Sequence, residues 1–453
     1  MKPFNKRLQF AFRILLNPYI ITNLSRLRTI DGGGISPFSI FLYMVKALYR
    51  FPGFYDYRVD VRIKGMTELV YLILSTPERM KKMRESGYKF VGKWAVNPTD
   101  IYFGSRVSAI DPFFFAFCRM IAVSDNSYAV RGRAQLSPDA CPAQAAAYTV
   151  LSEDIIKLDF FYPFIGPWCY DSQYCFESLR SKLKGVFGEQ PYILSERQRG
   201  ISKDFMLSEL RKFVIQIEEL TGEKYDPEFM RKEIKLENEL RGIIFDIQNM
   251  MLEDRPPLAS LDLILATFIS GDWLGDPLAC MDVLCNMRDF LKKRLRNNES
   301  GWGLKENPIR ILITGIAWGD LGLYNILDDL GGVIVGSECV MSNYMLKTRE
   351  DGDPLENLAE RFINTPYTFN PGEKARWTVN NIKRMKRVDG VVFNCNFGCN
   401  YNATASRIII DSIKEQLDIP VLLINSDLPG ENHGQMRTRF GAFFEMIRKK
   451  RKK

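Results

Sequence analysis

The chain has 453 residues, of which 46% are hydrophobic, and it carries a net charge of +8. This size and apolar content indicate an ordinary globular protein with two or three domains. The positive charge gathers at the C-terminus (446–453), where it suits the end of a helix, and no nucleic-acid recognition motif accompanies it, so we expect no nucleic-acid binding.

The remaining composition argues against a membrane span and against a secreted disulfide framework. The longest apolar stretches, such as 36–45, are much shorter than the roughly 20 residues that a spanning helix needs. The nine cysteines are an odd number at irregular spacing, and no cleavable leader is evident. We therefore expect a cytoplasmic protein whose cysteines are free thiols or metal ligands.

In chain order, residues 1–87 carry apolar residues at helical spacing and predict a helical N-terminal region that packs on the body of the protein. Residues 88–200 alternate short apolar runs with helical segments, which predicts a first α/β domain with a parallel sheet. The expected strands lie in the runs 88–96, 112–123, 155–166 and 190–196.

Residues 201–304 read as a helical connector, because apolar residues recur there at intervals of three and four, for example in 203–224. A second α/β domain follows at 305–453. Its expected strands lie in 309–315, 331–338, 388–393 and 421–427, and a closing helix covers 436–450. Strand and helix alternate throughout, which predicts a doubly wound parallel sheet.

Most of the cysteines fall where ligands gather in such sheets, beyond the carboxyl ends of strands or at the start of a helix. These six are Cys141, Cys169, Cys175, Cys339, Cys395 and Cys399. The other three, Cys118, Cys280 and Cys285, read as small buried apolar residues.

The spacing of these thiols does not suit structural zinc. Zinc generally takes four ligands in short-spaced pairs, whereas here Cys169 and Cys175 form one wide pair and Cys395 and Cys399 another, in different predicted domains. Iron–sulfur clusters take thiolates from widely separated segments. Spacing alone leaves a cluster and scattered structural thiols equally open.

Several segments, in the right order, resemble the benzoyl-CoA reductase / 2-hydroxyacyl-CoA dehydratase family. The C-terminal half of that family is similar to "GCNYNATASRIIIDSIKEQLDIPVLLINSD" (398–427) and "MRTRFGAFFEMI" (436–447). Its cysteine segments resemble "LSPDACP" (136–142) and "CYDSQYCFESL" (169–179), and its second-domain opening resembles "IRILITG" followed by "GGVIVGSE". The resemblance covers about residues 90 to 448.

The resemblance implies two facing Rossmann-like or flavodoxin-like domains with a [4Fe–4S] cluster in the cleft between them. Transferred residue by residue, Cys141, Cys169 and Cys399 are the expected ligands. With three protein thiolates, one iron keeps an open position for substrate or solvent.

The resemblance also implies an enzyme, a lyase or an oxidoreductase, that acts on a CoA thioester by one-electron chemistry. Family members either form a ketyl radical and expel the 2-hydroxyl group or reduce an aromatic ring. The electron comes from a separate ATP-hydrolysing iron–sulfur activator, and the chain itself contains no G-x-x-x-x-G-K-[ST] loop. Members work with a related second subunit or as dimers.

Two alternatives stay open at this point. The extra thiols Cys175, Cys339 and Cys395 suit a double-cubane [8Fe–9S] protein that reduces small molecules, or they are unligated neighbours. The number of iron atoms per chain distinguishes the two: about eight indicates the double cluster, and about four indicates a single cluster with unligated neighbours. The chain could also be a noncatalytic electron-transfer or assembly subunit, since a fold does not determine its chemistry.

A few further residues attract attention. Ser105 and Arg106, in "YFGSRVSAIDP", are expected to offer an amide and a guanidinium to an acyl or phosphate oxygen of the substrate. His433, the only histidine, reads as a surface loop residue, and Asp427 as a cap of the loop after its strand.

Overall fold

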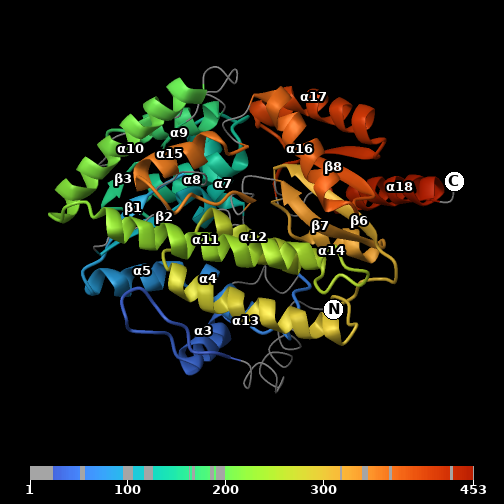
Figure 1. Ribbon diagram of the computed structural model, residues 1–453, viewed down its shortest axis with the longest axis horizontal. Coiled ribbons are helices and arrows are strands. Elements are labelled where there is room, and N and C mark those ends of the chain that lie inside the picture. Colours follow the sequence, from blue (N-terminus) through green and yellow to red (C-terminus); the bar gives the residue numbers. More distant parts are fainter. Residues whose placement is uncertain are drawn as a thin grey trace.

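A computed structural model describes the fold. The residues that it describes are 24–50, 57–94, 106–116, 126–162, 164–165, 169–183, 188–189, 199–316, 319–338, 345–366, 370–428 and 432–451. Two regions with parallel strands lie side by side, and long helices run beneath both of them (Figure 1). The predicted α/β class with two parallel sheets is confirmed.

The first sheet has the strand order β2-β1-β3, and every pairing in it is parallel. Its strands are β1 (Lys89–Gly92), β2 (Val107–Ile110) and β3 (Phe160–Phe161), with a separate parallel pair, β4 (Phe164–Ile165) and β5 (Gly188–Glu189). Its helices are α7 (Ser127–Gln135), α8 (Pro142–Ser152) and α9 (Tyr170–Leu179).

The prediction of a strand in 112–123 is wrong for residues 112–116. The strand lies earlier, at β2, and residues 112–116 are helical. Asp111 explains the difference, because its carboxylate accepts the backbone N–H groups of Phe113 at 2.8 Å and of Phe114 at 3.3 Å. With Pro112 in the first turn, this is a helix start, which the apolar run concealed. Residues 117–123 lie outside the described part of the chain.

The helical layer consists of two groups. The N-terminal group is α3 (Pro37–Arg50), α4 (Met66–Leu74) and α5 (Thr76–Glu85), and the central group is α10 (Arg199–Thr221), α11 (Pro227–Met250), α12 (Ser260–Phe268) and α13 (Pro277–Arg296). α11 packs on α13, and α4 packs on α12 and α13. The domain boundaries expected near 87, 200 and 304 stay predictions. No helix in the described ranges is long and apolar enough to cross a membrane.

The second sheet has the order β7-β6-β8-β9, and all its strands are parallel. The strands are β6 (Ile309–Gly315), β7 (Gly332–Glu338), β8 (Gly390–Asn396) and β9 (Val421–Ser426). Every residue of β6, β7 and β8 is buried, as expected for parallel strands covered on both faces. The predicted strands of this region are therefore confirmed.

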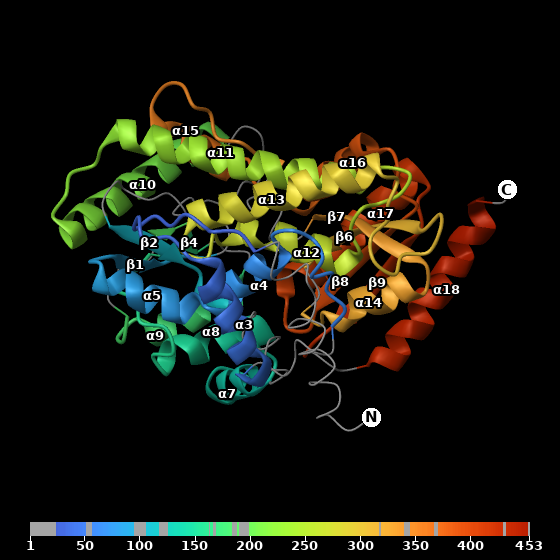
Figure 2. The same ribbon diagram turned by 90° about the horizontal axis from the view of Figure 1, so that it is seen from below.

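Helices cover both faces of this sheet (Figure 2). α14 (Gly322–Asp329) packs with α18 (His433–Arg451), and α16 (Pro371–Met385) packs with α17 (Asn400–Leu417). α15 (Pro354–Ile363) instead packs on α10, next to the first sheet. The chain continues from β6 to β7 on one side and later returns to β8 on the other side of β6. The carboxyl ends of β6 and β8 therefore mark the topological switch point, where open α/β sheets bind ligands.

Candidate functional site

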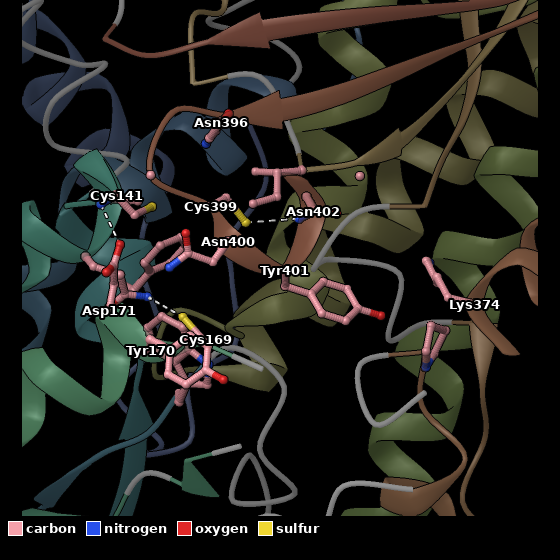
Figure 3. A pocket seen from close by; sticks show the side chains of 18 residues that line it. Cys141, Cys169, Tyr170, Asp171, Lys374, Asn396, Cys399, Asn400, Tyr401 and Asn402 are labelled. Carbon is pink, nitrogen blue, oxygen red and sulfur yellow. Dashed lines mark hydrogen bonds between the residues drawn. The ribbon is translucent and has the colours of Figure 1, made fainter. Parts of the chain in front are cut away.

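A cavity lies at this switch point and carries three cysteines. Gly315 and Ile316, at the end of β6, and the loop after β8 form its side toward the second sheet. Cys141, Cys169 and Cys399 all line it, although they come from distant parts of the chain. Figure 3 shows their sulfur atoms turned toward the same space. The structure thus brings the three expected ligands together.

Each of these cysteines is the residue immediately before a helix. Cys141 precedes α8, Cys169 precedes α9 and Cys399 precedes α17. Three helix N-termini therefore converge on one cavity. Their free N–H groups and the positive ends of their dipoles favour negative charge, and a thiolate at such a position is stabilised.

The backbone of each helix start contacts its cysteine. The N–H groups of Ala143 and Gln144 lower the pKa of Cys141, and those of Tyr401 and Asn402 lower that of Cys399. The N–H of Ser172 does the same for Cys169. The sequence reason is local, because a cysteine that ends a loop directly before a helix points its sulfur at the unpaired N–H groups of the first turn.

Burial acts in the opposite direction. It is the largest influence on all three thiols and raises the pKa of Cys169 to about 12 and that of Cys141 further still. Repulsion between the thiolates adds to this, since Cys399 raises the pKa of both Cys141 and Cys169. The three buried thiols would therefore become thiolates together only beside a positive partner, and soft sulfur ligands of this kind are ones that bind metals.

Side-chain donors also reach the sulfurs. Asn402 donates its Nδ2 to Cys399 Sγ at 3.2 Å, and Gln144 donates its Nε2 to Cys169 Sγ at 3.8 Å. Both amides lie three residues after a cysteine of the site, in the first turn of a helix. Donors of this kind orient metal-bound sulfur and stabilise its negative charge.

Within the described ranges, no group of three or more His, Cys, Asp or Glu side chains is placed so that it could hold a metal ion. A mononuclear site needs all sulfurs about 2.3 Å from one centre. In an iron–sulfur cluster each thiolate binds its own iron, so that the sulfurs stand farther apart around a shared core. Three cysteines that line one cavity are chemically suited to such a cluster.

Gly398 allows two of the cysteine loops to touch. It has a φ of +80°, and a Cβ atom there would lie 2.5 Å from the carbonyl oxygen of Asp139 and 2.7 Å from the backbone nitrogen of Cys141. Only glycine tolerates both this backbone conformation and this approach. Gly398 thus lets the loop before Cys399 lie directly against the loop before Cys141.

Arg133 on α7 connects the same two loops. Its guanidinium binds both carboxylate oxygens of Asp427, at 2.6 and 3.2 Å, and its Nε donates to the carbonyl oxygen of Ala140 at 2.8 Å. The guanidinium also lies 5.7 Å from the ring centre of Phe397. One side chain therefore contacts the residue before Cys141, the loop before Cys399 and the end of β9.

Asp171 fixes the backbone of Cys141 from the side of α9. Its carboxylate accepts the backbone N–H of Cys141 at 2.7 Å and also lines the cavity. Burial raises the pKa of Asp171, whereas the hydrogen bond from Cys141 and the charge of Arg133 lower it. Asp171 lies two residues after Cys169, so it ties two of the cysteine segments together.

The sequence singled out none of these supporting residues. A polar residue three positions after each of two cysteines was a usable signal for Gln144 and Asn402. Arg133 and Asp171 carried no comparable signal, because their partners are distant in the sequence. Asp427, interpreted as a loop cap, instead pairs with Arg133.

Of the extra thiols, the structure describes Cys175 and Cys395, and neither is among the residues that line the cavity. Cys175 is buried within α9 and its Sγ lies 3.8 Å from the carbonyl oxygen of Gln144. Cys395 is buried in β8, 3.7 Å from the carbonyl oxygen of Asn396, and burial and Cys399 raise its pKa to about 11. Cys339 and Cys118 fall outside the described residues. Cys280 is buried, as expected, whereas Cys285 is only partly buried.

Other candidate residues lie elsewhere. Arg106 is exposed and precedes β2, where its guanidinium lies against Gly87, so it is at the amino end of the strand and does not line the cavity. Ser105 lies outside the described residues, and the substrate role of this pair stays a prediction. His433 begins α18, and its Nε2 lies 2.6 Å from the buried carboxylate of Asp320.

The remaining wall of the cavity is largely apolar. It includes Trp94, Phe113, Ile316, Pro366 and the rings of Tyr170 and Tyr401. A buried lysine, Lys374 in the first turn of α16, also lines it. Such a wall offers a surface to an apolar group of a ligand.

Comparison with known proteins gives a consistent result. The family described as 2-hydroxyglutaryl-CoA dehydratase, D-component, matches residues 107–447. The putative dehydratase subunit YjiM of Escherichia coli (strain K12) is 25% identical over 252 residues, which are 54% of this chain and 64% of that protein. The (R)-phenyllactyl-CoA dehydratase beta subunit of Clostridium sporogenes is 23% identical over 258 residues, 55% of this chain and 66% of that subunit. Both alignments thus span slightly less than two thirds of the relative.

Proposed function

Because this chain belongs to the 2-hydroxyglutaryl-CoA dehydratase D-component family, we propose that it is a component of an enzyme that removes water from a 2-hydroxyacyl-CoA thioester. Cys141, Cys169 and Cys399 would hold a [4Fe–4S] cluster in this enzyme. The observation that carries the proposal is that all three cysteines begin helices around one cavity at the sheet's switch point.

The cluster, when bound, would supply one electron at low potential to the substrate. The residues of this chain would hold it and shape its surroundings. The three helix N-termini would stabilise the negative charge of the thiolates, and the amides of Gln144 and Asn402 would orient two of them. The apolar wall would receive the acyl group and keep water from the site.

Two partners belong to this proposal. The electron would come from a separate ATP-hydrolysing iron–sulfur activator, and a related second subunit or a second copy of the chain would complete the enzyme. The description of the family as one component, and of a relative as a beta subunit, supports such an assembly.

Dehydration is better supported than ring reduction or a small-molecule reductase. Both curated relatives are described as dehydratase subunits. A double-cubane [8Fe–9S] centre would need additional thiolates at the cavity, whereas Cys175 and Cys395 lie next to backbone carbonyl oxygens beside it. These contacts favour the smaller cluster.

The test is turnover with a defined substrate. The anaerobically purified chain, with its partner subunit, is mixed with (R)-phenyllactyl-CoA, ATP and a reduced activator, and formation of the unsaturated acyl-CoA is followed by chromatography. We expect product only when activator and ATP are both present, and none with Cys399→Ser. The matched control is Cys285→Ser, because Cys285 lies on α13 outside the cavity and should leave turnover unchanged.

Two results would argue against the proposal. If reduced activator and ATP leave the visible and electron paramagnetic resonance spectra of the protein unchanged, the chain is not an electron-accepting component. If the spectra change but none of several 2-hydroxyacyl-CoA esters is dehydrated, the chain has kept the centre without this activity and serves as an electron-transfer subunit.

A further inference from the structure

Gln144 has one buried atom whose hydrogen bond is missing. Its side chain is 2% exposed and lines the cavity, and its Nε2 donates to Cys169 Sγ at 3.8 Å. Its Oε1 is buried and has no hydrogen-bond partner among the described residues. An amide oxygen buried without a donor is costly, so such an atom in a cavity points to a ligand that supplies the donor.

The proposed cluster cannot supply this donor. Thiolates and inorganic sulfide accept hydrogen bonds and carry no proton to donate. The cavity is also lined by side chains that carry donors, among them Trp94, Lys374 and Tyr401, but none of the described residues donates to Oε1. The donor that Oε1 lacks would thus be supplied from solution, by water or by the substrate.

We infer that Gln144 binds the 2-hydroxyl group of the acyl-CoA substrate, with Oε1 accepting the hydrogen bond that the hydroxyl donates. This inference rests on the proposed function. The two polar atoms of the amide then have different partners. Nε2 donates to Cys169 Sγ, and Oε1 accepts from the substrate hydroxyl that is lost as water. Gln144 is thus a substrate-binding residue placed directly beside Cys169.

The affinity for a ligand should depend on this hydrogen bond. A 2-hydroxyacyl-CoA satisfies Oε1, whereas the same acyl-CoA without the hydroxyl leaves it unpaired. The unsaturated product has lost this hydroxyl as water and therefore lacks the contact. It should dissociate more readily than the substrate. Sites built around a buried polar group discriminate against ligands that lack its partner.

A pair of probes tests this directly. (R)-Phenyllactyl-CoA and 3-phenylpropionyl-CoA differ only in the 2-hydroxyl, and their dissociation constants are measured anaerobically by calorimetry without activator, so that no turnover occurs. For the unaltered protein with its partner subunit we expect the hydroxylated ligand to bind about tenfold more tightly. Gln144→Met keeps the length of the side chain but removes its acceptor, and should reduce the preference to less than twofold.

Two further variants keep the test interpretable. Gln144→Glu retains an acceptor oxygen at the same place and should retain the preference. Gln416→Met changes an exposed glutamine of α17 that donates to Ser412 nearby, and this variant should bind both ligands as the unaltered protein does. Iron content is measured for each variant. If Gln144→Met loses iron, Gln144→Glu decides, and loss of the preference in an iron-replete Gln144→Glu protein overturns the inference.

The outcomes separate this inference from the proposed function. If the unaltered protein binds neither CoA ester, the proposed function fails and the role of Gln144 fails with it. If it binds both esters equally well, or if Gln144→Met keeps the full preference, only the role of Gln144 is overturned. A preference that disappears in Gln144→Met and survives in Gln144→Glu supports it.

Discussion

Arg133 and Asp427 form a two-point ion pair that joins helix α7 to the end of strand β9, across the cavity's two sides. The pair is largely buried, with 13% of the arginine and 30% of the aspartate side chain exposed. Because the same guanidinium also holds the Ala140 carbonyl and lies near the Phe397 ring, it fixes the loops that carry Cys141 and Cys399 relative to each other. Two-point arginine–carboxylate pairs combine strength with fixed geometry.

Arg133→Ala should therefore weaken the metal centre. We expect iron to be lost to a chelator several-fold faster, because a charge-assisted contact of about 1.5–3 kcal/mol no longer fixes the two loops. Release is followed by absorbance under anaerobic conditions. The control is Arg131→Ala on the same helix, whose exposed pair with Glu153 should contribute little. Equal release rates for the two variants would show that Arg133 does not support the site.

Gly398→Ala should disrupt the contact between the loop before Cys399 and the loop before Cys141. The new Cβ would collide with the backbone of Asp139 and Cys141, and the left-handed conformation adds strain of about 1–3 kcal/mol. We expect lower stability in urea and lower iron content. Gly441→Ala is the control, because that glycine lies within α18 with no atom within 4 Å of the added carbon. Iron content equal to that of the control would contradict the close loop contact.

Asn402→Leu should change the reduction potential more than the stability. It removes the donor to Cys399 Sγ, so the reduced, more negative centre loses stabilisation. For a net hydrogen bond of about 1 kcal/mol the potential should fall by roughly 40 mV, measured by a redox titration followed by electron paramagnetic resonance. Thr404→Val, on the exposed side of α17, should leave the potential in place. An unchanged potential in Asn402→Leu would mean that Cys399 does not bind the redox centre.

Asp262 gives a prediction on stability and pH that is independent of the cysteines. It is buried in α12, accepts the backbone N–H of Asp60 at 2.9 Å, and burial raises its pKa to about 8. The folded protein thus keeps the proton while the unfolded chain loses it near pH 4, so stability falls as pH rises between about 4 and 8. Asp262→Asn cannot lose this proton.

The difference between Asp262→Asn and the unaltered protein should therefore increase in favour of the variant from pH 5 to pH 8. Urea unfolding at the two pH values measures it. Asp411→Asn, at a partly exposed position on α17, is the control for the Asp-to-Asn substitution itself. A constant difference for Asp262→Asn would mean that the carboxyl is already ionised in the folded protein.

The sequence predicted the parts of the fold and site that depend on local pattern. The apolar runs of β6 to β9 identified the second sheet, and parallel strands bring their carboxyl ends to one edge, which is why Cys399 could be expected there. The apolar run after Asp111 was wrongly predicted to be a strand, because a short apolar run has the same sequence pattern in a buried helix as in a buried strand.

Contacts between distant segments could not be predicted in this way. Nothing near Arg133 in the sequence indicates that its partner is Asp427, and the need for glycine at 398 arises from the backbone of another loop. The unpaired Oε1 of Gln144 becomes visible only once the cavity around it has formed. The three cysteines that line the cavity could be singled out from the sequence, whereas the residues that position them could not.

If Cys141, Cys169 and Cys399 share one inorganic centre, the iron and sulfide content of the protein will show it. We expect about four iron and about four sulfide per chain after anaerobic purification. Serine at any one of the three positions should lower both values together. Full iron content in all three single variants, or no stoichiometric iron in the unaltered protein, would show that the three cysteines do not share a centre.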